Sequence, residues 1–206
     1  MTLAVANYHD QHGHFPPPYL ADGEGRPMHS WRVLILPYIE QDELYKQYDF
    51  NEPWNGPKNR LLADRMPKMY ALHGEHRPGL TTTNYVAVTG PETVWSPDQP
   101  LRFEDVMDRT GSTILVVENR GANIHWMEPR DFVLDEMPME LNHPLGLNSK
   151  YKSPAVAMTD GSIRQLRPPL TPETLRALFT RNGGEPLSDE DGGWKLLPDG
   201  RLRELR

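Results

Sequence analysis

Three histidines near the N-terminus are the first residues whose types could support chemistry. His9, His12 and His14 lie close together, with Asp10 among them. Imidazole and carboxylate groups are ligands that Zn²⁺ and similar metal ions accept. Their spacing matches no closed zinc motif, and three prolines at residues 16–18 restrict the loop beside them. The pattern therefore favours structural or solvent-exposed side chains, with hydrogen bonds from His9 and Asp10 to neighbouring loops as a further alternative.

A second group of candidates is acidic and lies near the C-terminus. It consists of Glu185, Asp189, Glu190 and Asp191. Clustered carboxylates can hold Ca²⁺. A calcium-binding loop requires ligands at alternate positions, a central glycine and a distal glutamate, and this segment lacks that order. A solvated acidic loop is the favoured interpretation.

A third candidate is a pair of carboxylates at the ends of predicted strands. Glu118 ends an apolar run, and Asp160 follows another. Two such groups can serve as general acid and base, and glycoside hydrolysis needs them about 5–10 Å apart. However, turn chemistry explains Asp160, and Glu118 can serve as a cap or pair with an arginine. Catalysis by this pair is the less favoured hypothesis.

Other enzyme signatures are absent from the sequence. It contains no Walker loop, dinucleotide-binding glycine pattern, nucleophile elbow or zincin helix. It also contains no cysteine, which excludes disulfides, thiol catalysis and thiolate metal sites. We therefore predict a protein that is not an enzyme, with no catalytic, cofactor-binding or metal-binding residues and no cofactor.

Composition limits the partners and the shape of the elements. The 206 residues include 22 basic and 29 acidic side chains, a net charge of −7, which disfavours nucleic acids and anionic membrane surfaces. No run of eighteen apolar residues is present to form a transmembrane helix. Proline occurs 21 times, roughly twice its usual share of about 5%. Such a chain should form short elements joined by long irregular loops.

The densest apolar block, residues 30–48, must organise the core. Ser30 can cap a helix, and Pro37 bends the segment or opens a second helix. We expect two short helices or one kinked helix, with Trp31 and the aliphatic run that follows facing the core.

Further short elements are predicted on both sides of this block. Residues 1–8 resemble the last turns of a helix that Gly13 ends. Helices are also expected at residues 58–65 and from Thr171, and strands at 82–89 and 112–118. A type I′ hairpin is expected around Asp160-Gly161, another hairpin at 194–205, and an irregular excursion at 121–148. Because helices come early and strands mostly later, the pattern predicts an α+β fold with an antiparallel sheet.

Several of these stretches together resemble one bacterial family. They are Asn7-Tyr8-His9-Asp10, the run from Ser30 to Gln41, Glu52-Pro53-Trp54, Thr83-Asn84-Tyr85, residues 113–118, and residues 160–162 with 175–185. The sequence resembles domain-of-unknown-function family 1559. Members of this family often carry a prepilin-type N-terminus and a C-terminal His-x9-Asp-Gly signature.

The resemblance implies a pilin-like or pseudopilin-like protein of the cell envelope. An N-terminal helix would anchor and assemble it, and residues 1–8 would be the remnant of that helix. The resemblance thus implies a single pilin-like domain at residues 1–185, followed by an appendage at 186–206. One departure is that Lys150 stands ten residues before Asp160, where the signature has histidine, and the nearest histidine is His143.

The resulting expectation is a non-enzymatic head domain that acts by self-assembly or by binding protein partners. Trp54, Trp95 and Trp126 are candidate contact residues, because aromatic side chains concentrate at interface cores. The alternative is that they fill the core beneath loops, which is favoured for Trp54. The alternative function is an extracytoplasmic ligand- or metal-binding module, for Ca²⁺ or carbohydrate.

Overall fold

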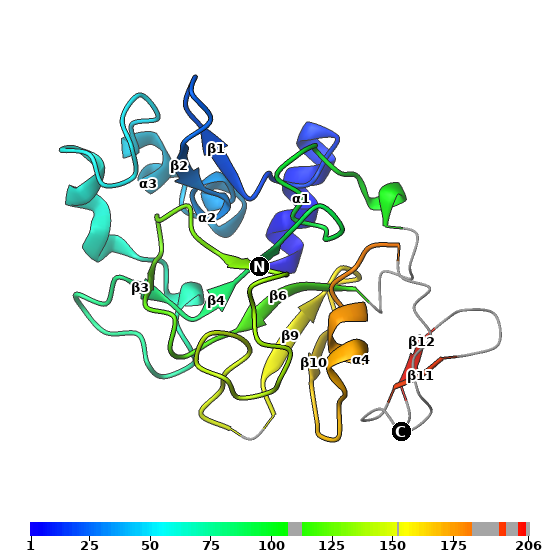
Figure 1. The fold of residues 1–206 in the computed structure, drawn as a ribbon. Coiled ribbons are helices and arrows are strands. Elements are labelled where there is room, and N and C mark those ends of the chain that lie inside the picture. Colours follow the sequence, from blue (N-terminus) through cyan, green and yellow to red (C-terminus); the bar gives the residue numbers. More distant parts are fainter. Residues whose placement is uncertain (107–112, 152, 183–193, 197–201, 205–206) are drawn as a thin grey trace.

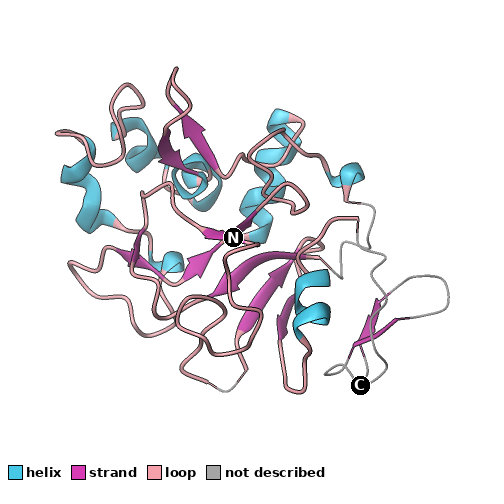
Figure 2. Ribbon diagram, viewed as in Figure 1, coloured by secondary structure: helices cyan, strands magenta, loops and turns pink. Residues whose placement is uncertain are grey.

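The computed structural model describes residues 1–106, 113–151, 153–182, 194–196 and 202–204. Short helices and several small sheets make up these residues (Figures 1 and 2). The predicted α+β class is confirmed. Within the described residues, no helix has both the length and the apolar character needed to cross a membrane.

Helix α1, Thr2–His12, begins the chain and continues four residues beyond the predicted stretch. It ends at Gly13, as predicted, because this residue has a φ of 77° and its N–H donates to the His9 carbonyl (2.7 Å). Glycine adopts this left-handed conformation without the steric cost that a side chain brings. Ala4, Val5 and Tyr8 fix one side of α1 to the core.

The apolar block forms short helices with a buried face, as predicted, but there are three of them rather than two helices or one kinked helix. A hairpin of β1, Tyr19–Ala21, and β2, Pro27–Ser30, leads into α2, Trp31–Leu34, which is followed by η1, Leu36–Ile39, and α3, Asp42–Gln47. The Ser30 hydroxyl accepts a hydrogen bond from the Arg32 N–H (3.2 Å) and caps α2. Trp31 and the aliphatic residues after it are buried.

Three 3₁₀ helices follow this block along the chain. They are η2, Asn59–Arg65, η3, Lys68–Tyr70, and η4, Phe103–Asp105. The helix predicted at residues 58–65 is therefore present, with 3₁₀ rather than α geometry.

The main sheet has four antiparallel strands in the order β10-β9-β6-β4. These are β10, Ile163–Gln165, β9, Ala155–Met158, β6, Ile114–Glu118, and β4, Tyr85–Val86. Every residue of β6 is buried, and the strand has a partner on each side. The unbroken apolar run therefore predicted a central strand correctly.

The single strand predicted at residues 82–89 is wrong in detail. This stretch forms three short strands, β3, β4 and β5, and each pairs with a different partner strand. β3, Thr82–Thr83, pairs with β7, Ile124–His125, while β5, Val88–Thr89, runs parallel to β8, Phe132–Val133. Asn84 separates β3 from β4. Its side chain accepts from the Leu72 N–H (3.0 Å) and donates to the Asn119 carbonyl (3.2 Å). Such side-chain bonds to the backbone compete with a continuous ladder.

The predicted hairpin at Asp160-Gly161 forms between β9 and β10, but its turn type differs. Met158 N–H donates to the Ser162 carbonyl (2.9 Å), which leaves residues 159–161 in the turn. Only Gly161 among them has positive φ, at 88°. A type I′ turn needs positive φ at both central residues, so that prediction is wrong.

The C-terminal elements agree partly with the predictions. Helix α4, Pro172–Ala177, begins at Thr171, whose hydroxyl accepts from the Thr174 N–H (3.2 Å). It ends earlier than the predicted Asn182-Gly183. β11, Trp194–Leu196, and β12, Leu202–Glu204, pair antiparallel as expected. Their turn and the expected boundary at residue 185 lie outside the described residues.

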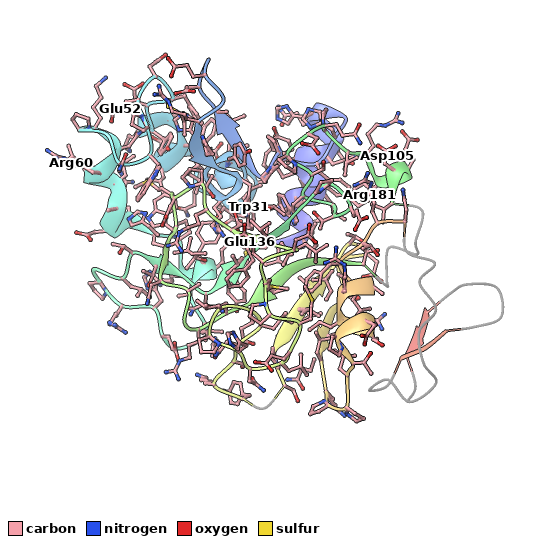
Figure 3. All side chains as sticks on the ribbon, in the orientation of Figure 1. Trp31, Glu52, Arg60, Asp105, Glu136 and Arg181 are labelled. Atoms are coloured by element: carbon pink, nitrogen blue, oxygen red, sulfur yellow. The ribbon has the colours of Figure 1, made fainter. Side chains whose placement is uncertain are left out.

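Three tryptophans show where the core lies (Figure 3 labels Trp31). The rings of Trp31 and Trp95 meet with centroids 4.8 Å apart, and Trp126 lies in the same core cluster. Trp95 and Trp126 are 1% and 0% exposed. The hypothesis that these two form a contact surface is therefore wrong, because loops cover them. Trp54 packs on the edge of the core and is half-buried.

Candidate functional site

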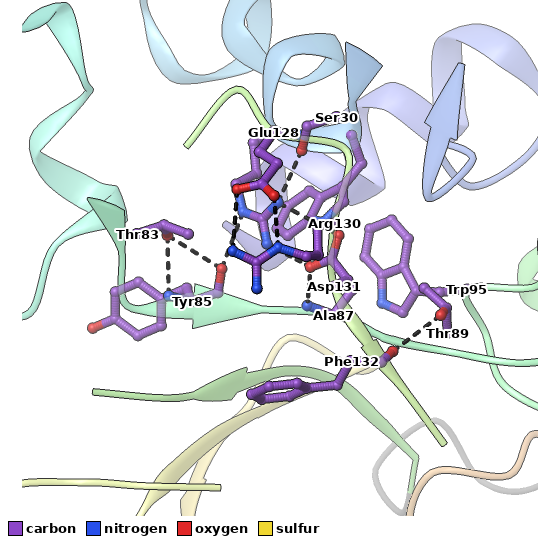
Figure 4. Close-up of polar contacts among 12 residues, drawn as sticks. Ser30, Thr83, Tyr85, Ala87, Thr89, Trp95, Glu128, Arg130, Asp131 and Phe132 are labelled. Atoms are coloured by element: carbon purple, nitrogen blue, oxygen red, sulfur yellow. Dashed lines mark hydrogen bonds and ion pairs between the residues drawn. The ribbon is translucent and has the colours of Figure 1, made fainter. Parts of the chain in front are cut away.

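A buried ion pair joins Arg32 and Asp131 and collects several polar contacts around it (Figure 4 labels Asp131). Their side chains are 0% and 2% exposed, and an Arg32 Nη2–H donates to Asp131 Oδ1. The other carboxylate oxygen accepts from Trp31 Nε1–H (3.1 Å). Ala87 N–H donates to Oδ1 (2.7 Å). The carboxylate is therefore surrounded by donors from two segments of the chain, α2 and the residue that follows β4.

The guanidinium of Arg32 also has hydrogen-bond acceptors around it. Arg32 Nε–H donates to the Tyr85 carbonyl (3.1 Å), and an Nη1–H donates to Ser30 Oγ (2.9 Å). Burial raises the pKa of Asp131, while the Arg32 charge and the hydrogen bonds act in the opposite direction. With every partner inside the protein, this pair joins α2 to β4 and to the segment before β8. Its role is structural.

The sequence does not predict this pair, although it contains one signal for it. Arg32 interrupts a run of apolar residues, and a buried arginine needs an acidic or carbonyl partner. The position of Asp131 in an irregular stretch gave no indication that it was that partner.

The N-terminal histidines turn to different neighbours. His9 Nε2 accepts from the Phe103 N–H (3.3 Å), and its ring packs on Phe15 and Phe103. The rings of His12 and His14 pack on Tyr8 instead, and their nitrogens lie within hydrogen-bond distance of the Tyr38 hydroxyl (3.2 Å) and the Phe15 carbonyl (2.7 Å). Across the described residues, no group of three or more His, Cys, Asp or Glu side chains is placed to hold a metal ion.

The two candidate catalytic carboxylates lie far apart. Met158, just before the turn with Asp160, pairs with Ile114 at the start of β6, whereas Glu118 is the last residue of that strand. Four residues of strand span ~13 Å at about 3.3 Å each. The paired-carboxylate hypothesis is therefore wrong for Glu118 and Asp160.

Each of these carboxylates also has a local role. Glu118 accepts from the Ser149 hydroxyl (2.6 Å) and the Ala155 N–H (3.0 Å), which fastens the start of β9. Asp160 accepts from the Ser162 N–H (2.8 Å) within its turn. These contacts agree with the capping and turn interpretations.

Two other predicted features can also be placed. Lys150, at the position of the signature histidine, forms a surface ion pair with Glu75 (3.5 Å), which Arg120 shares (3.6 Å). His143 lies 3.7 Å from Glu140. The acidic group Glu185, Asp189, Glu190 and Asp191 lies outside the described residues.

Trp54 is carried on a braced loop and packs on His125, with ring centroids 4.9 Å apart. Glu52 Oε1 accepts from the Asn59 N–H (2.7 Å), and the Asn59 amide donates to the Pro53 carbonyl (3.1 Å). Burial lowers the pKa of His125. The brace holds Trp54 at the surface in one place.

A hollow of about 500 Å³ opens beside the outer side of α1. Its lining comes from the first turns of α1, from η4 and from the β9–β10 turn: Thr2, Leu3, Ala6, Phe103, Thr159, Asp160 and Gly161. Leu3 is 72% exposed. The hollow is therefore largely apolar, with one carboxylate at its rim.

The architecture defines an α+β protein, and one family model matches part of it. Residues 1–71, from α1 through η3, match the family described as "Protein of unknown function (DUF1559)". The resemblance to this family that the sequence predicts is therefore confirmed over residues 1–71. Neither the curated proteins nor the solved structures contain a match.

Proposed function

We propose that this domain is the non-enzymatic head of a pilin-like protein of the cell envelope and that it works by binding other protein subunits. The observation that carries the proposal is the outer side of α1. The simplest partner is a second copy of the chain.

The outer side of α1 has the character of a protein contact. Ala4, Val5 and Tyr8 hold the helix on the core, whereas Leu3 projects into solvent beside Ala6. Leu3 and the apolar residues of the adjoining hollow together form a contiguous apolar patch, and such patches can mark interaction sites. Binding there would bury Leu3 without disturbing the core.

The use of polar groups within the fold also supports the proposal. Asp131 pairs with Arg32, and Glu118 fastens β9. Both carboxylates thus have structural roles, and neither faces the hollow beside α1. Assembly through an apolar contact needs no catalytic group.

Sedimentation velocity over a range of concentrations tests the proposal. We expect concentration-dependent association of the untagged chain, and we expect Leu3→Arg to abolish it by placing a charge in the contact. Leu61→Arg is the matched control, since Leu61 is 77% exposed on η2, outside the hollow. A wild-type chain that stays monomeric, or a Leu3→Arg variant that associates as strongly as the control, contradicts the proposal.

A second candidate function is carbohydrate binding at Trp54. The braced loop and the His125 ring hold the indole at the surface, and a fixed aromatic ring offers a large contact area at small entropic cost. Glycan-array binding that Trp54→Ala removes would favour this function. Equal binding by both proteins, or none by either, would reject it.

A further inference from the structure

Two histidines approach each other at the C-terminal end of α1. His12 is the last residue of the helix, and Gly13, with its φ of 77°, turns the chain so that His14 comes back toward the helix. Their ring centroids lie 6.3 Å apart, and Tyr8 contacts both rings. The turn therefore places two imidazoles side by side at the edge of the molecule.

The hydrogen bonds determine which nitrogen of His12 is free. Tyr38 O–H donates to Gln11 Oε1 (2.7 Å), an oxygen that can only accept. Because the hydroxyl has one proton, its oxygen must accept from His12 Nε2–H (3.2 Å). Neutral His12 therefore has its lone pair on Nδ1.

The same reasoning applies to His14. Its Nδ1 lies 2.7 Å from the Phe15 carbonyl oxygen, which can only accept, so Nδ1 carries the proton. The lone pair of neutral His14 is on Nε2. Neither His12 Nδ1 nor His14 Nε2 has a hydrogen-bond partner among the described residues, and neither is buried.

We propose that His12 and His14 together bind a divalent transition-metal ion, such as Zn²⁺ or Cu²⁺, through His12 Nδ1 and His14 Nε2. A histidine nitrogen lies about 2.0–2.1 Å from zinc, so two rings on one ion have centroids roughly 4.5–6.4 Å apart, depending on the nitrogen–metal–nitrogen angle. The observed 6.3 Å lies at the wide end of this range, where the two nitrogens stand on nearly opposite sides of the ion. Each ring already donates its other N–H to an oxygen, which is the usual arrangement of metal-binding histidines.

The surroundings also suit a cation. The carbonyl end of α1 carries the negative end of the helix dipole. Asp10, with a side chain 79% exposed, adds a negative charge in the same last turn. Because only two protein ligands are offered, water would complete the coordination, in keeping with the lack of any three-ligand group in the described chain.

Isothermal titration of the untagged chain with ZnCl₂ or CuCl₂ tests the site. We expect one ion per chain, with Cu²⁺ bound more tightly than Zn²⁺. His12→Gln and His14→Gln should each weaken binding by at least about tenfold. Tyr38→Phe keeps the ring but removes the oxygen that orients His12, and it should weaken binding ~10-fold. His73→Gln, at an exposed histidine on another loop, should change nothing.

Metal-induced shifts of the imidazole NMR signals provide a test that needs no variant. The proposal predicts that the signals of His12 and His14 shift most. A wild-type chain that binds neither ion overturns it. So does binding that both His→Gln variants retain, or NMR shifts confined to other residues.

Discussion

Replacing Asp131 with asparagine should destabilise the protein more than any surface change. The substitution keeps the shape of the side chain but leaves the Arg32 charge buried, with 0% exposure and no counter-ion. Breaking a buried pair in this way costs about 3–5 kcal/mol. Since a domain of this kind is stable by only about 5–15 kcal/mol, the loss is a large fraction of the total.

Urea unfolding followed by circular dichroism measures this loss. Arg32→Met and the double variant complete a thermodynamic cycle. The loss of stability in the double variant should be smaller than the sum of the two single losses by ~1–3 kcal/mol. Glu43→Gln is the matched control, because its pair with Lys46 is 79% and 68% exposed. Exposed pairs contribute about 0–1 kcal/mol.

Two results would refute the structural role of the ion pair. One is an Asp131→Asn variant that loses no more stability than Glu43→Gln. The other is strict additivity of the Arg32 and Asp131 changes, since two groups in direct contact must be coupled.

Three further predictions concern stability. Burial lowers the pKa of His29 below its ordinary 6.5, so its contribution to the free energy of unfolding is present above pH ~6.5 and is lost as the pH falls through the folded-state pKa. Unfolding midpoints measured from pH 8 to 5 should show this loss of stability. His29→Gln should flatten the profile, and the pH dependence that remains should come from His125, whose pKa is also lowered. An unchanged profile in His29→Gln would contradict the assignment. Gly13→Ala should cost about 1–2 kcal/mol, because the site has open space but a positive φ; a neutral effect in urea would show that the turn relaxes. Thr171→Ala should cost ~1 kcal/mol through loss of the α4 cap, whereas Thr171→Ser should restore most of the melting temperature; equal losses in both variants would reject the cap.

The segment that matches the family model depends on residues far beyond it. Arg32 lies within residues 1–71, but its partner Asp131 does not. Phe15 N–H donates to the Leu101 carbonyl (2.7 Å), and Trp31 packs on Trp95. Residues 1–71 alone would expose a buried charge and half of an aromatic core. The matched segment is therefore part of a larger cooperative unit.

Sequence alone determined the local elements, because their signals are local. Gly13 ends α1, Ser30 caps α2 and Thr171 caps α4 through contacts with residues a few positions away. The unbroken apolar run of β6 was enough to predict a central strand, because apolar and polar residues do not alternate along it and neither face of the strand is suited to solvent.

Tertiary structure alone decided the pairings between distant residues. Asp131 receives Arg32 from 99 positions away, and no spacing rule predicts such a partner. Trp95 and Trp126 are buried because distant loops cover them, although an aromatic residue in a loop has the same sequence pattern whether it is covered or exposed. The free nitrogen of His12 follows from a hydrogen bond to the Tyr38 oxygen, which the fold brings within reach from 26 positions away. Composition and periodicity report the local backbone, whereas these features depend on which surfaces meet.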